Sequence, residues 1–283
     1  MKFHLLVVLL MTLASRLPGQ VSVEVVMEQD QFLRDESVPL KVRITNLSGQ
    51  TLRLGEDKSW LSFSVENRDG SVVAKLSEAP VEGEFTLDSA MRADRSVDLM
   101  PCYELSQPGR YSVSAVVRIK QWDREVASKA RSFDIVRGSK IWEQEFGVPT
   151  ADGEPEARKY ALQLAPFFKD RKLYLRLTDP GENRAFKVFP LGSTVSFGRP
   201  EMLLDPKSNL HVLHQTGARS FAYNMINPSG DVLIRHTYDY TDTRPTLKSG
   251  NDGRVLVGGG QRRLTAGDIP RLSSTNDVRE PKL

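Results

Sequence analysis

Apolar and polar residues alternate along the first half of the chain, from residue 21 to about residue 136. Successive side chains of a β-strand point to opposite faces, so each alternating run predicts a strand with one buried face and one largely solvated face. About seven short antiparallel strands in roughly 115 residues favour a two-sheet sandwich. The alternating runs span residues 21–27, 38–44, 61–65, 97–99, 111–119 and 133–135, with turn-forming segments at 46–49, 68–70 and 107–109.

One short motif in this half resembles a known family. Pro108-Gly109-Arg110-Tyr111 is similar to the start of the penultimate strand in bacterial immunoglobulin-like domains. The resemblance covers residues 21–136 and implies an immunoglobulin-like antiparallel β-sandwich, which we place at 21–137, with the Tyr111 hydroxyl bonded back to the main chain. The cysteine pair of antibody-type domains is absent, because Cys102 is the only cysteine. Such domains serve as spacers, adhesins, chaperones and inhibitors, so the fold does not select a function.

The alternation stops between residues 138 and 158, a polar segment rich in turn-forming residues. We interpret it as a linker or a domain-entry loop, in which Trp142 and Phe146 could pack as one helical turn against either domain. Beyond it lies a weak internal repeat, in which 173–178 aligns with 210–215, and 184–188 with 219–223. A third copy could begin at 254–257. Four short strands are expected at 202–205, 209–215, 220–226 and 232–240.

Four strands in about 40 residues is the size of one β-propeller blade, and residues 159–268 resemble such repeats. The whole chain is therefore predicted to be all-β, with the sandwich followed by a second antiparallel β domain of blade-like four-stranded repeats. About 110 residues are too few for a closed propeller of at least about four blades. Three arrangements stay open: packing on the first domain, completion by a homo-oligomer, or an ordinary meander. The tail at 269–283 is expected to be loose.

Alternation within 220–240 groups apolar and aromatic side chains on one face of the predicted blade. Val232, Ile234, His236, Tyr238 and Tyr240 are expected to share that face. A blade cannot bury both faces alone, so this surface is either a core between blades or an interface. The candidate interface or inter-blade core residues are Phe221, Tyr223, His236, Tyr238 and Tyr240.

Residues 1–20 have the pattern of a secretory signal peptide. Lys2 precedes an apolar segment of about ten residues, which is too short to cross a bilayer. We expect cleavage after Ala14 or Gly19; the alternative is a buried N-terminal strand. A single cysteine cannot form an internal disulfide, so an exported chain of this kind suits a bacterial periplasm or exterior better than a eukaryotic secretory route. The sequon Asn46-Leu47-Ser48 is correspondingly weak evidence for glycosylation.

The charge balance argues against nucleic acid as a partner. The chain has 39 basic and 36 acidic residues, and removal of Lys2 and Arg16 with the signal leaves 37 against 36. Binding to a phosphate backbone needs a concentrated excess of Lys and Arg, and none is present. The same balance makes the chain peripheral to a membrane at most.

No cluster of residues points to a cofactor or a metal ion. His211 and His214 are three apart on a predicted strand and face opposite sides, while His236 is expected two strands away. The segment Gly192–Gly198 lacks the pattern of a nucleophile elbow. Cys102 is expected to be a small buried hydrophobe. Asp239 and Asp242 form an acidic pair of the kind that glycosidases use, although such pairs are common in turns.

The sequence therefore favours an exported non-enzymatic binding or structural protein of the bacterial cell envelope, with a protein or glycan partner. Two alternatives stay open. One is a periplasmic chaperone or inhibitor that acts through the first domain. The other is a carbohydrate-active hydrolase with a site on the blade-like half.

Overall fold

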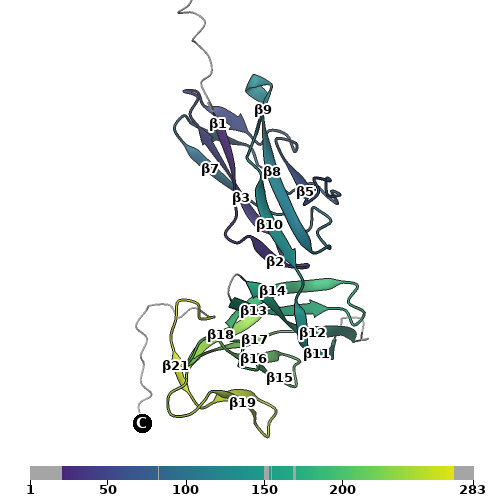
Figure 1. The fold of residues 1–283 in the computed structure, drawn as a ribbon, viewed down its shortest axis with the longest axis vertical. Coiled ribbons are helices and arrows are strands. Elements are labelled where there is room, and N and C mark those ends of the chain that lie inside the picture. Colours follow the sequence, from purple (N-terminus) through teal and green to yellow (C-terminus); the bar gives the residue numbers. More distant parts are fainter. Residues whose placement is uncertain (1–20, 82, 150–152, 154, 168–169, 271–283) are drawn as a thin grey trace, which may run out of the picture. The chain divides into compact units, whose positions relative to one another are not determined.

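The computed structural model describes residues 21–81, 83–149, 153, 155–167 and 170–270, which are almost entirely β-structure (Figure 1). The predicted signal peptide and nearly all of the predicted tail lie outside these residues. The strands form two compact units. The first comprises the described residues up to Phe32 and Ser37–Ile135, and the second comprises Leu33–Glu36 and the described residues from Val136 onward. No helix among the described residues is long and apolar enough to span a membrane.

The first unit contains two antiparallel sheets, as the alternation predicts. One sheet has the strand order β1-β3-β7, and the other has the order β2-β10-β8-β5, with β9 paired to β8; β4 and β6 form a separate pair. Four short strands, β2, β4, β6 and β9, were not expected. The strands are β1 Val21–Val26, β2 Gln31–Leu33, β3 Pro39–Asn46, β4 Leu52–Leu54, β5 Leu61–Asn67, β6 Phe85–Leu87, β7 Arg92–Asp98, β8 Gly109–Ile119, β9 Arg124–Ala127 and β10 Arg131–Val136.

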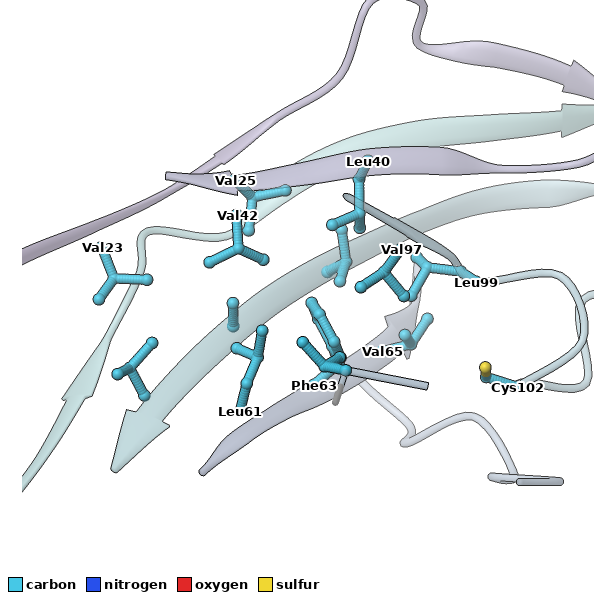
Figure 2. Close-up of a cluster of buried hydrophobic side chains, with 14 of the residues drawn as sticks. Val23, Val25, Leu40, Val42, Leu61, Phe63, Val65, Val97, Leu99 and Cys102 are labelled. Carbon is cyan, nitrogen blue, oxygen red and sulfur yellow. The ribbon is translucent and has the colours of Figure 1, made fainter. Parts of the chain in front are cut away.

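One continuous apolar core lies between these sheets (Figure 2). Along β8, Val113, Ala115, Val117 and Ile119 are fully buried, and the residues between them are half-buried or exposed. Cys102 is buried in the same core, as expected. The core follows from the period-two pattern, because each strand contributes every second side chain to it.

Two polar details of the first unit bear on the sequence predictions. The Tyr111 hydroxyl donates a hydrogen bond to the Gln107 carbonyl oxygen at 2.6 Å, which confirms the bond expected there. Asn46 of the sequon is fully buried, and its Nδ2 donates to the carbonyl oxygens of Gln50 and Leu87 at 2.7 and 2.8 Å. An amide nitrogen held in this way is not accessible for glycosylation in the folded protein.

The second unit contains two antiparallel meanders and a hairpin. One sheet has the order β11-β12-β13-β14, the other has the order β15-β16-β17-β18-β21, and β19 pairs with β20. The linker interpretation of 138–158 is wrong, because β11 and the start of β12 occupy most of it, and Trp142 and Phe146 lie on β11 rather than on a helical turn. The strands are β11 Ser139–Val148, β12 Glu156–Phe167, β13 Asp170–Thr178, β14 Ala185–Thr194, β15 Glu201–Leu204, β16 Leu210–Gln215, β17 Ser220–Ile226, β18 Val232–Asp239, β19 Thr246–Ser249, β20 Val255–Gly258 and β21 Gln261–Arg263.

The two meanders pack on each other through a shared core. That core joins Tyr160, Leu162 and Leu175 of the first sheet to Leu210 and Val212 of the second. The four strands expected between 202 and 240 are confirmed to within a residue or two. The expected third copy at 254–257 belongs instead to the β19–β20 hairpin. None of the described sheets closes into a propeller, because the repeats pack as two layers rather than around an axis.

A β-bulge divides the expected aromatic face of β18. The register pairs Ile226 with Val232 but Met225 with Ile234, so Leu233 is an extra residue. Val232 therefore packs into the core between the sheets, whereas Ile234 packs on the outer face of the second sheet. The prediction that Val232 and Ile234 share a face is wrong for this reason.

Four residues from the first half of the chain belong to the second unit. Leu33 packs with Ala165, Tyr174 and Val188 on the outer face of the first meander. The buried Arg176 guanidinium donates to the Arg34 carbonyl oxygen at 3.2 Å and to the Asp35 carboxylate at 2.5 Å. The division between the units is thus not a single point near residue 137.

Candidate functional site

The aromatic residues predicted as an interface lie on the outer face of the second meander, and the central ones are buried. Phe221 is 2% exposed and Tyr223 is 6% exposed, in a cluster with Leu247 and Val257 of the β19–β20 hairpin. His236 and Tyr238 are half-buried, and Tyr240 is 40% exposed. Most of this face is therefore core within the unit, and the hairpin covers part of it.

A polar network crosses this face. Tyr223 Oη lies 2.8 Å from His211 Nδ1, and His211 Nε2 lies 3.4 Å from the Asp205 carboxylate. Burial lowers the pKa of His211, which the Asp205 carboxylate partly offsets, and burial raises the pKa of Tyr223 to about 12. His211 is thus neutral near pH 7, and the network holds β16 and β17 in place. The described residues contain no group of three or more side chains suited to a metal ion.

His214 faces the opposite side of β16, as the strand period predicts. It is fully buried, and neither ring nitrogen has a hydrogen bond of sound geometry. Its Nε2 lies 3.6 Å from where a Cβ on Gly192 would be, so the ring packs against the end of β14. Burial and the Arg235 charge lower its pKa to about 4, and the Ser193 backbone opposes the shift. Asn224 is also fully buried, and its Nδ2 has no partner among the described residues.

Asp239, one member of the acidic pair considered for hydrolysis, is held by two hydrogen bonds. The Asp239 carboxylate accepts hydrogen bonds from Arg263 Nε at 2.8 Å and from Ser220 Oγ at 3.1 Å. The bond from Arg263 lowers the pKa of Asp239, against a small opposing effect of burial. A general acid of a glycosidase needs a raised pKa, so Asp239 does not fit that role.

A polar groove of about 500 Å³ lies at one end of the second unit. It is formed where β13 begins, where β14 ends, and where the chain leaves β16. Two hydrogen bonds fix its floor: Val195 N and Thr194 Oγ1 both donate to the Gln215 carbonyl oxygen, at 3.1 and 3.3 Å. The groove is lined by Asp170, Arg171, Ser193, Thr194, Val195, Ser196, Phe197 and Thr216.

The groove combines free polar groups with an exposed ring. The side chains of Asp170, Arg171, Ser193, Ser196 and Thr216 form no hydrogen bond or ion pair with any described residue. The Phe197 side chain is 76% exposed, more than any other large hydrophobic residue of the described chain. The volume of the groove lies in the range of small-molecule sites. The arrangement can hydrogen-bond a polyhydroxylated molecule while one face of that molecule packs on the ring.

A second pocket, of about 360 Å³, lies in the first unit near Asp30, Arg110 and Asp134. There two of the charged groups already bond to each other, because Arg110 donates to both oxygens of Asp134 at 2.9 and 3.1 Å. No exposed aromatic ring lines it. The groove beside Phe197 is therefore the stronger candidate site.

The segment Gly192–Gly198 contributes most of the residues that line this groove. Its sequence lacks the pattern of a nucleophile elbow, and the structure is compatible with that conclusion. The segment carried a different signal in its sequence: three hydroxyl-bearing residues, Ser193, Thr194 and Ser196, stand beside Phe197. A hydroxyl-rich turn with an aromatic residue indicates a binding loop as well as a connection.

Comparisons with known proteins add little to this geometry. No family model matches the chain, and no curated relative matches it. Among solved structures, the chain is similar to Spo0M, a sporulation control protein from Bacillus subtilis, with 9% identity and a TM-score of 0.29 over 56% of this chain and 80% of that one. A similarity at this TM-score supports neither a fold family nor a function.

Proposed function

We propose that this chain is an exported, non-enzymatic binding protein whose second unit binds a carbohydrate in the groove beside Phe197. The observation that supports it is the exposed Phe197 ring at a groove with unpartnered hydroxyl and charged side chains. Ligand sites combine aromatic side chains with a few placed polar groups, so the position of this ring beside free hydrogen-bonding groups favours a ligand.

Each part of the groove has a role in this proposal. The apolar C–H face of a sugar ring packs on Phe197, and this contact fixes the plane of the sugar. Ser193, Ser196 and Thr216 each offer a hydroxyl that can donate or accept a hydrogen bond, which matches the mixed character of sugar hydroxyls. The Gln215 carbonyl oxygen holds Thr194 and Val195, so the floor is formed before the ligand arrives.

The test is binding of the purified mature chain to a panel of soluble polysaccharides, by affinity gel electrophoresis and then by calorimetry. Phe197→Ala is expected to weaken binding at least tenfold, about 1.4 kcal/mol. Tyr240→Ala is the matched control, since it removes a partly exposed aromatic ring of the same unit outside the groove. The proposal fails if no polysaccharide binds, or if Phe197→Ala binds as tightly as the wild-type chain.

Export is tested separately by sequencing the N-terminus of protein recovered from outside the cytoplasm. A mature chain that begins between residues 15 and 21 is expected. An intact Met1 in that fraction would contradict the signal-peptide part of the proposal.

A further inference from the structure

Two arginines at the groove lack a counter-charge. About half of the basic side chains of the second unit have a carboxylate partner, whereas Arg171 and Arg199 have none among the described residues. Arg171 lines the groove, and Arg199 follows Phe197 by two residues in the same loop. The paired side chains are Arg34, Lys140, Arg158, Lys159, Arg176, Lys187, Arg254, Arg262 and Arg263.

The alternation along β13 separates the two charges that line the groove. Arg171 pairs in register with Thr194, and the next residue, Lys172, pairs with Ser193. Arg171 therefore lies on the face of Leu173, whereas Asp170 lies on the opposite face with Lys172. Asp170 and Arg171 thus point to opposite faces, and the Arg171 side chain shares its face with Thr194 of the groove floor.

An arginine is suited to a carboxylate because its planar fork forms two parallel hydrogen bonds. Sugars whose hydroxymethyl group is oxidised carry such a carboxylate on the ring itself. The ring could then pack on Phe197 while its carboxylate binds Arg171, with Arg199 adding positive charge at the same loop.

We propose that the groove selects acidic glycans, those with carboxylate-bearing sugar rings, and that Arg171 is the residue that determines this selectivity. This inference rests on the proposed function, since it names the class of carbohydrate that the same groove takes.

The experiment compares polygalacturonate with the same polymer after full methyl esterification, which removes the charge and keeps the backbone. Alginate and hyaluronan provide two further uronate polymers. The wild-type chain is expected to bind at least one uronate polymer, with at least tenfold preference for polygalacturonate over its ester if that polymer is the one bound. Raising the salt concentration should weaken binding to the acidic polymer.

Three variants test which basic side chain is responsible for the preference for the acidic polymer. Arg171→Gln should reduce affinity for the acidic polymer about tenfold and so remove the preference for the acidic polymer over its ester. Arg199→Gln should give a smaller loss. Lys207→Gln, which removes an exposed charge of the same unit outside the groove, should have no effect.

Equal binding of the acid and the ester, or an unchanged preference in Arg171→Gln, would overturn this inference. If neutral polymers bind and Phe197→Ala abolishes that binding, the proposed function stands while the acidic selectivity falls. If no polymer of either kind binds, both fall.

Discussion

The two units of this chain differ in how many polar side chains they bury. In the first unit, Asn46 is the one buried polar or charged residue among those described, and it is fully hydrogen-bonded. The second unit buries ten. Within the part of the chain that the structure describes, it also contains all the buried side-chain atoms without a partner, in Thr178, His214 and Asn224. The ten are Glu36, Lys159, Arg176, Thr178, Thr194, His211, His214, Gln215, Asn224 and Asp268.

This difference has an energetic meaning. An apolar core is stabilised by burial alone and responds little to pH, whereas a buried polar group without a partner costs about 1–3 kcal/mol. The second unit therefore carries costs that the first unit lacks, and it also holds the stronger candidate site. The first unit is expected to be the more stable support, and the second the part that responds to conditions and to ligands.

The largest expected effect is on the first unit. Trp60 is buried in the apolar core, where Nε1 donates to the Val81 carbonyl oxygen at 3.0 Å. Trp60→Ala should lower the free energy of unfolding by about 3–5 kcal/mol. Scanning calorimetry of the full chain should show a lower melting temperature for one unfolding transition and an unchanged melting temperature for the other. If both melting temperatures fell equally, the two units would unfold together, and the comparison between them would lose its basis.

The second effect is the pH dependence of the second unit. The pKa of His214 is lowered from 6.5 to about 4, chiefly by burial and then by the Arg235 charge. Between these two values the unfolded chain binds a proton that the folded chain does not. Stability is therefore lost as the pH falls from 6.5 to about 4, by about 3 kcal/mol in total.

His214→Leu isolates this contribution, because burial also lowers the pKa of His211 and of His236. The difference in unfolding free energy between wild type and variant, measured by urea titration from pH 7 to pH 4, should shrink or change sign at the acidic end. A difference that is constant over this range would show that His214 does not titrate as described.

The third effect compares the stability lost when two ion pairs are broken: one that involves a buried arginine of the second unit, and one that is exposed on the first unit. Asp35→Asn removes the counter-charge of the buried Arg176 and keeps a residue that tolerates the positive φ of 64° at this position. Asp35 is a quarter exposed, so we expect a loss of about 2 kcal/mol rather than the full cost of a buried charge. Asp134→Asn breaks the exposed pair with Arg110 and should cost less than about 1 kcal/mol. Equal losses in chemical denaturation would contradict the comparison.

Much of the fold could be predicted from the sequence, because alternation survives wherever a strand has one buried face. Five strands of the first unit and the meander at 201–239 follow from that rule; the five are β1, β3, β5, β8 and β10. β11 was not predicted, because it is an edge strand with little alternation. Only Phe146 is buried, and Gln144 interrupts the apolar series from Trp142 to Val148. The bulge at Leu233 was not predicted either, because one extra residue moves the side chains that follow it to the other face of the strand without changing the composition.

The site was harder to predict than the fold. Its hydroxyl groups come from the ends of strands and from a loop, so they converge only when the meanders pack, and their spacing in sequence has no period. The aromatic residues that alternation did group, Phe221 and Tyr223, are core residues. Alternation identifies side chains that are buried together, whereas a binding site is formed by those left uncovered.

The smallest expected effect on stability is at the groove itself. Phe197 is mostly exposed, so Phe197→Ala removes little buried surface and should change the free energy of unfolding by less than about 0.5 kcal/mol. Phe221→Ala, which deletes the same side chain from a buried position of the same unit, should cost about 3–5 kcal/mol. Urea denaturation of both variants, with glycan binding measured in parallel, separates the two roles. Phe197→Ala should lose binding and keep its stability. If it instead unfolds as readily as Phe221→Ala, the ring belongs to the core of the unit, and the groove beside it loses the feature that distinguishes it from the rest of the surface.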